Sequence, residues 1–312
     1  MTAHNARIDK KKLTKWLAES SNAHAVDYHH LLLSAADGNT WQSLIKELKL
    51  YFESAHLDSR KHFHNFASID LHATATSGTT ATVYPNSLPR MAQKAFFGEI
   101  FCGLVAEHYA LVGGKTWVVP VFLLRNHDVA KYYLKKLVRK VRVSKEIPGR
   151  HGDDFIALEV DSTGTVAGAL VAEAKYRATL NTSVYNGLLN GIKTKTGGTK
   201  SGILEDLNDS HSIPDDLKTI AEILHEIDKN KYASIINSIE QIELSGSSSS
   251  IRRTDMFVII GAKLPKKHKP PFLATKKKPT NYTQKRDLQA VEIVIPDAEN
   301  LIQSLYNSLY QP

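Results

Sequence analysis

Hydrophobic positions in the first 65 residues recur at helical spacing. The recurring residues are Leu13, Trp16, Leu17, Leu44, Ile45, Leu48 and Phe52. Apolar side chains three and four positions apart share one face of a helix, so we expect residues 8–65 to be helical. The stretch 68–89 is poor in charge and rich in turn and β-branched residues, which predicts a loop or a weak hairpin. Residues 1–87 are therefore expected to form a mainly helical N-terminal region with a loop.

A long apolar helix is predicted over residues 88–111. Pro89 stands at its start, where the missing N–H is tolerated, and Gly113-Gly114 follows its end. The continuous apolar run 117–124 is typical of a buried strand. Residues 129–141 have the pattern of a basic amphipathic helix.

Two consecutive strands are predicted over 155–160 and 165–176, joined by the turn signal Asp161-Ser162-Thr163-Gly164. Further helices are expected over 183–192, 215–228, 232–244 and 298–310, and further strands over 256–261 and 291–295. The order of elements predicts an α/β fold, with a mixed sheet flanked by helices. We expect one domain over 88–312, with inserted helices at about 200–250 and a basic loop at 263–286.

The composition is that of an ordinary globular protein, with 42% apolar residues. No stretch approaches the roughly 18 unbroken apolar residues of a membrane helix, and the first residues lack the apolar segment of a secretory signal. The single cysteine, Cys102, excludes an internal disulfide and a cysteine-rich zinc site. We therefore expect a cytoplasmic protein with no membrane partner.

Positive charge is concentrated in two segments of a chain whose net charge is +8. One segment lies within 131–145, and the other, 263–286, contains nine Lys or Arg residues. Such segments suit the phosphates of DNA, although a solvated helix face and a mobile loop are alternatives. The expected nucleic-acid contacts are Lys135, Lys136, Arg139, Lys140, Lys266, Lys267, Lys276 and Lys277.

The triplet Glu173-Ala174-Lys175 carries the strongest chemical signal. Side chains two positions apart on a strand point to the same side, so Glu173 and Lys175 are expected to be neighbours. Asp154 begins the preceding strand, and a tight hairpin would bring it close to Glu173. Two adjacent carboxylates require a cation between them, and Mg²⁺ or Mn²⁺ suits oxygen ligands. We expect Glu173 and either Asp153 or Asp154 to hold the metal, with Lys175 acting on the attacking water.

This constellation resembles the PD-(D/E)xK nuclease superfamily, in which an Asp begins one strand and a (D/E)-x-K triplet lies on the next. The resemblance implies a restriction-endonuclease-like core and metal-dependent cleavage of DNA. It also implies a fourth catalytic residue, a Glu on the preceding helix, for which Glu99 is the counterpart and Glu107 a weaker substitute. The sequence departs from the short form of the motif, because Gly152 stands where the family often has Pro near the Asp.

Residues 88–180 are also similar to the nuclease subunit of the Hachiman anti-phage defence system. This similarity implies an effector DNase that is restrained and activated by a superfamily 2 helicase partner. Apolar residues of the N-terminal region are the expected docking surface: Trp16, Trp41, Leu44, Leu48 and Tyr51. Two alternatives remain. One is an effector nuclease of another defence system, and the other is a non-catalytic nucleic-acid-binding or docking subunit whose carboxylate and lysine form a structural ion pair.

Overall fold

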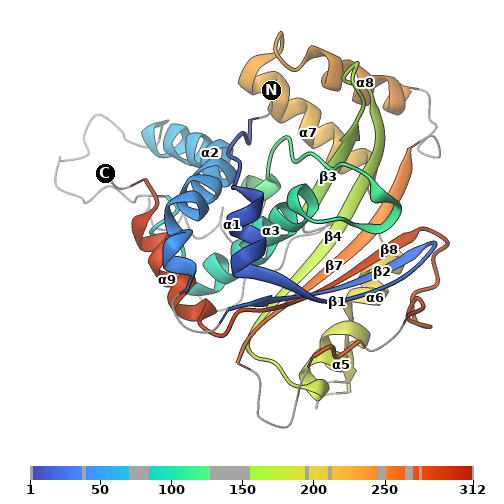
Figure 1. The fold of residues 1–312 in the computed structure, drawn as a ribbon. Coiled ribbons are helices and arrows are strands. Elements are labelled where there is room, and N and C mark those ends of the chain that lie inside the picture. Colours follow the sequence, from blue (N-terminus) through green and yellow to red (C-terminus); the bar gives the residue numbers. More distant parts are fainter. Residues whose placement is uncertain are drawn as a thin grey trace.

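A six-stranded mixed sheet flanked by eight helices makes this an α/β protein in the part of the chain that the structure describes (Figure 1). The structure is a computed structural model, and it describes residues 3–36, 40–69, 84–126, 155–193, 197–209, 213–244, 251–263, 270–273 and 276–310. The sheet strands are β1 (Leu17–Ala25), β2 (Tyr28–Ala35), β3 (Phe155–Val160), β4 (Val166–Thr179), β7 (Arg252–Lys263) and β8 (Asp287–Val294). The helices are α1 (Lys10–Trp16), α2 (Ile45–Ile69), α3 (Arg90–His108), α5 (Thr182–Asn190), α6 (Ile203–Asp209), α7 (Ile213–Asp228), α8 (Ala233–Leu244) and α9 (Ala298–Ser308). None of the helices in these ranges is long and apolar enough to cross a membrane.

The strands lie in the order β1-β2-β8-β7-β4-β3. The four central strands are parallel, and β1 and β3 pair antiparallel at the two edges. The run Met256–Ile260 in β7 is fully buried, as expected for a parallel strand that is covered on both faces. A separate two-stranded ribbon is formed by β5 (Ile192–Lys193) and β6 (Thr199–Lys200).

The β3–β4 hairpin confirms the two strands predicted from the sequence. The side chain of Asp161 accepts hydrogen bonds from the backbone N–H groups of Thr163 and Thr165, which closes the turn. Gly164 has φ +87°, a conformation that glycine adopts without strain. The hairpin register pairs Phe155 with Ala172, one residue before Glu173.

Helices cover the two faces of the sheet in different groups. Helices α1, α2, α3 and α9 share one large apolar core with one face of the sheet. On the opposite face, α7 and α8 pack over β3 and the first part of β4, whereas α5 and α6 pack over β7 and β8. Figure 1 shows the α7–α8 pair and the α5–α6 pair at well separated places along the strands.

The N-terminal region differs from the prediction of a helix over residues 8–65. Residues 17–35 form the β1–β2 hairpin, and β2 pairs with β8 in the main sheet. The five apolar residues expected to form a docking surface are also buried in the core, with exposures of 6% or less. The expectation of a docking surface at these residues is therefore wrong, because the N-terminal helices use their apolar faces to complete the core.

The apolar run 117–124 also differs from its prediction. Only Val118 makes a strand-like bridge there, to Leu158 of β3, and a short 3-10 helix covers Leu123–Asn126. The run lies beside the outer edge of β3 and buries side chains in the cores on both faces of the sheet, so its apolar character reflects burial and not a regular strand. The predicted basic helix at 129–141 lies outside the described residues.

Candidate functional site

Glu173 and Lys175 are neighbours on β4, as their spacing predicts. The ammonium nitrogen of Lys175 lies 2.8 Å from Oε2 of Glu173 and donates a hydrogen bond to it. The Glu173 side chain is 9% exposed, while that of Lys175 is 33% exposed. The pair therefore joins a nearly buried carboxylate to an amine that solvent can reach.

The pair lies on the sheet face opposite α3. Glu173 and Lys175 are in register with Phe257 and Ile259 of β7, and residues in register on parallel strands share a face. Phe257 and Ile259 pack against the α5–α6 core. Upstream on β4, Ala169 points to the same face and belongs to the α7–α8 core. The two polar side chains thus lie along β4 between the two helix pairs of this face.

Arg177 extends this polar row and was not predicted from the sequence. It lies two positions beyond Lys175 on β4 and therefore shares its face. The Arg177 side chain is half-buried, and one of its terminal nitrogens donates to the Tyr176 carbonyl at 2.8 Å. Charged residues at every second position, Glu173, Lys175 and Arg177, are the sequence signal that could have identified Arg177.

Glu99 lies on the other side of the sheet from this row. It is 2% exposed on α3, and the residue before it, Gly98, packs directly on Ala174 of β4. Burial raises the pKa of the Tyr84 and Tyr306 hydroxyls, and the negative charge of Glu99 adds to this rise. Glu99 therefore lies near these two tyrosines. The described structure does not bring Glu99 onto the face of Glu173 and Lys175.

Glu107, the weaker substitute for Glu99, is occupied by contacts with the N-terminal segment. Its carboxylate lies 3.4 Å from His4 and 3.3 Å from Arg7, and it accepts a hydrogen bond from the Tyr51 hydroxyl at 2.9 Å. Burial alone would raise the pKa of Glu107, but His4 and Arg7 outweigh this effect and lower it. Glu107 therefore anchors the chain terminus to α2 and α3.

Asp153 and Asp154, the predicted metal ligands of the preceding strand, lie outside the described residues. Asp154 is bonded to Phe155, which pairs with the residue next to Glu173. Within the described ranges, no three His, Cys, Asp or Glu side chains come together as a metal site. Of the predicted ligands, the described structure therefore places Glu173 alone, and its carboxylate oxygens are of the type that Mg²⁺ prefers.

The predicted basic contacts are described only in part. Lys135, Lys136, Arg139, Lys140, Lys266 and Lys267 lie outside the described residues, whereas Lys276 and Lys277 are exposed. The next residue, Lys278, lies 2.7 Å from Asp27 in the β1–β2 turn, and its hydrogen bond lowers the pKa of Asp27. Apart from Lys263, which ends β7, the described residues of the predicted basic loop form no helix or strand, and the contact of Lys278 with Asp27 attaches them to the sheet.

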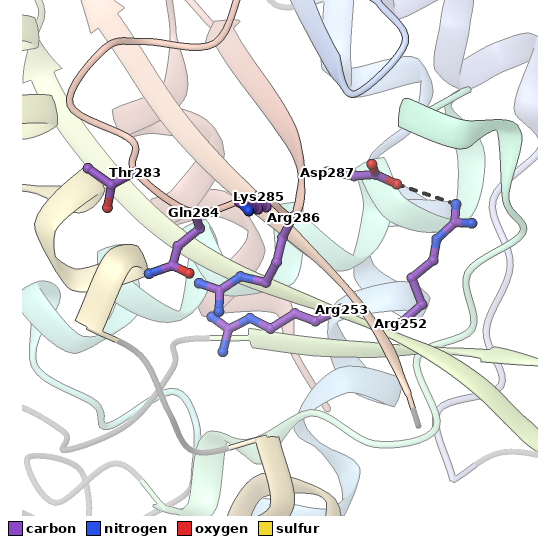
Figure 2. Close-up of a pocket in the computed structure, with 7 residues that line it drawn as sticks. All are labelled: Arg252, Arg253, Thr283, Gln284, Lys285, Arg286 and Asp287. Carbon is purple, nitrogen blue, oxygen red and sulfur yellow. Dashed lines mark hydrogen bonds and ion pairs between the residues drawn. The ribbon is translucent and has the colours of Figure 1, made fainter. Parts of the chain in front are cut away.

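A second charged region lies where β7 and β8 begin. Arg253 and Arg286 both bind the buried carboxylate of Asp255, and Arg252 pairs with Asp287 (Figure 2). These residues were not predicted to form one site, because the two strand ends are separated by more than thirty positions. No family model matches this sequence, and no curated protein is significantly similar to it.

Proposed function

We propose that the protein is a metal-dependent nuclease that cleaves DNA with the row of polar residues on β4. The observation that carries the proposal is the contact between Glu173 and Lys175, which share one face of β4 and lie next to the start of β3. The β3–β4 hairpin at the edge of a mixed sheet, with helices on both faces, supports a restriction-endonuclease-like core.

Each residue of the row has a distinct task in the proposed reaction. Glu173, with Asp154 or Asp153, would hold Mg²⁺ or Mn²⁺, which supplies polarisation of the phosphodiester and a more acidic bound water. Lys175 orients the attacking water or stabilises the negative charge that develops on the phosphate. The ion pair with Glu173 directs the amine to this position, and its partial exposure leaves the amine within reach of a substrate.

The substrate class follows from charge. A phosphodiester chain needs cations beside the reacting group, and Arg177 lies next in the row on the same face. Exposed Lys276 and Lys277, with the basic residues outside the described ranges, would contact the DNA backbone without reading its sequence. Control of this activity by a superfamily 2 helicase is part of the proposal, and it rests on the resemblance alone.

Incubation of the purified protein with plasmid DNA tests the proposal most directly. Cleavage in Mg²⁺ or Mn²⁺ that disappears in EDTA, and that Glu173→Gln removes, is the expected result. A protein that binds the plasmid in a salt-sensitive way but never cuts it would instead be a non-catalytic DNA-binding subunit, with Glu173 and Lys175 as a structural ion pair. Co-purification with a helicase encoded nearby tests the partner separately.

A further inference from the structure

A pocket of about 790 Å³ lies at the carboxyl ends of three parallel strands, β2, β8 and β7. Its lining consists of six small apolar residues and two polar ones: Ala35, Ala36, Ala262, Pro270, Val294, Pro296, Ser34 and Lys263. The described residues that line it thus include one cation and no carboxylate. The volume is in the usual range for small-molecule sites.

The chain leaves the neighbouring strands β7 and β8 toward opposite faces of the sheet. After β7, Phe272 and Leu273 pack against the core that contains α5 and α6. After β8, helix α9 packs in the core on the other face. Ligands of open α/β sheets bind outside the carboxyl ends of the strands, at the point where successive connections change faces. The pocket therefore lies where this class of fold places its ligands.

The buried carboxylate of Glu292 fixes one wall of the pocket. It accepts hydrogen bonds from the backbone N–H groups of Phe272 and Leu273 at 2.8 Å and 2.7 Å. The Phe272 ring also stacks on that of Tyr185 in α5, with the ring centroids 5.3 Å apart. These contacts hold in place the short segment that begins with Pro270, a residue of the lining. The wall is therefore formed before any ligand binds.

Two polar side chains of the lining can bind a ligand. Lys263 is exposed, and its ammonium group makes no hydrogen bond or ion pair with any residue that the structure describes. The hydroxyl of half-buried Ser34 also has no hydrogen-bond partner in the described part of the chain. An ammonium and a hydroxyl beside apolar walls suit a ligand that joins an anionic group to an apolar body.

The pocket is close to the polar row on β4 but separate from it. Arg177 is in register with Gly261 of β7, and Gly261 is in register with Val294 of β8. Residues in register on parallel strands share a face, so Arg177 and Val294 lie on one face, two strands apart. At the usual strand spacing this is about 10 Å. Leu180 fills the space between them, since a Cβ at Gly261 would be 2.8 Å from its side chain.

We propose that this pocket binds a nucleotide, with the base between the apolar walls and the phosphate at Lys263. A phosphate accepts hydrogen bonds from both an ammonium and a hydroxyl group, which Lys263 and Ser34 supply. The small side chains of Ala35 and Ala36 leave room for a planar base, and the prolines present flat apolar surfaces. The nucleotide is either free or one unit of a DNA strand that lies on the β4 row, because the two have the same chemistry.

Isothermal titration calorimetry in EDTA tests this site without metal at the β4 row. The probes are adenosine 5′-monophosphate, adenosine and a short single-stranded oligodeoxynucleotide. The nucleotide is expected to bind more tightly than adenosine, because adenosine lacks the group that contacts Lys263. Glu173→Gln should bind the nucleotide normally, so this test is independent of the proposed nuclease activity.

Two variants separate the phosphate contact from the base contact. Lys263→Gln should weaken binding of the nucleotide about tenfold or more and leave adenosine binding unchanged, through loss of a charge-assisted contact. Ala36→Leu should weaken binding of both probes, because the larger side chain occupies the space of the base. The matched controls are Lys229→Gln and Ala167→Leu, at an exposed lysine and an exposed alanine outside the pocket, and both should bind normally.

The oligodeoxynucleotide identifies the source of the nucleotide. If it binds more tightly than the free nucleotide and Ala36→Leu weakens its binding, the ligand is a unit of a DNA strand. Tighter binding of the free nucleotide would identify that molecule as the ligand. The proposal would be overturned if the nucleotide does not bind, if Lys263→Gln changes the affinities for nucleotide and adenosine equally, or if Ala36→Leu binds both normally.

Discussion

Gly98 of α3 lies directly over Ala174 of β4, so closely that a Cβ at Gly98 would be 3.2 Å from that of Ala174. This contact assigns Ala174 to the face covered by α3 and therefore turns Glu173 and Lys175 to the opposite face. It also separates the acidic residue of α3, Glu99, from the two residues that we propose as catalytic.

Our first prediction follows from this separation. Glu173→Gln should lower the rate of Mg²⁺-dependent plasmid cleavage by a hundredfold or more, on the order of the loss of one major transition-state contact. Glu99→Gln should keep cleavage within about tenfold of wild type while lowering the thermal unfolding temperature, because Glu99 is buried in the core. Cleavage assays with both variants, checked by circular dichroism, measure this difference. Loss of activity in a folded Glu99→Gln variant would place Glu99 in the metal site after all.

Lys175 provides a second prediction. Lys175→Ala should reduce cleavage by about a hundredfold or more and leave the fold intact, since the side chain is one-third exposed. Lys200→Ala is the control, because Lys200 is an exposed lysine on the separate β5–β6 ribbon. Initial rates of plasmid nicking compare the two variants. Equal rates for both would assign the Glu173–Lys175 contact a structural role only.

Asp154 and Asp153 can be distinguished in the same assay. We expect Asp154→Ala to reduce cleavage more than Asp153→Ala does, because Asp154 is bonded directly to the first residue of β3. When cleavage is measured at increasing Mn²⁺ concentrations, Asp154→Ala should lose more of its stimulation by Mn²⁺ than Asp153→Ala does. The reverse order would move the ligand by one residue and keep the nuclease proposal.

The hairpin was predictable from sequence because its signals are local. The turn at Asp161–Gly164, the two β-rich runs and the spacing of Glu173 and Lys175 all lie within 25 residues, and each matches the structure.

The β1–β2 hairpin was not predictable in the same way. Leu13, Trp16 and Leu17 have helical spacing across a boundary where α1 ends and β1 begins, and β2 is stabilised by pairing with the distant strand β8. The faces covered by each helix, and hence the position of Glu99, depend on tertiary packing that periodicity does not encode.

His56 provides a prediction about stability. Its ring nitrogens lie 2.9 Å and 3.2 Å from the hydroxyls of Tyr84 and Tyr306, and burial lowers its pKa to about 3. The folded protein therefore keeps His56 neutral, whereas the unfolded chain protonates it below about pH 6.5. The free energy of unfolding should be insensitive to this group above pH 6.5. It should fall by about 1.4 kcal/mol per pH unit as the pH decreases from there toward 3.

His56→Gln is the matched variant for this measurement, because an amide can bond to both tyrosine hydroxyls and does not titrate. Urea unfolding between pH 6 and pH 4 should show a slope that is smaller by about 1.4 kcal/mol per pH unit in the variant than in wild type. Identical slopes would mean that His56 is protonated in the folded protein.

The pairing of β2 with β8 has a consequence for synthesis of the protein. His30 and Glu292, in contact across these strands, are 262 positions apart, so β2 leaves the ribosome long before its partner exists. At about 5–20 residues per second, the delay is roughly 10–50 s. During that time the apolar run Leu31-Leu32-Leu33, which is buried in the finished sheet, is paired with β1 along one edge only, and its other edge has no partner strand. The nascent chain therefore depends on a chaperone or on rapid local packing against α1 and α2 to keep this strand from aggregating.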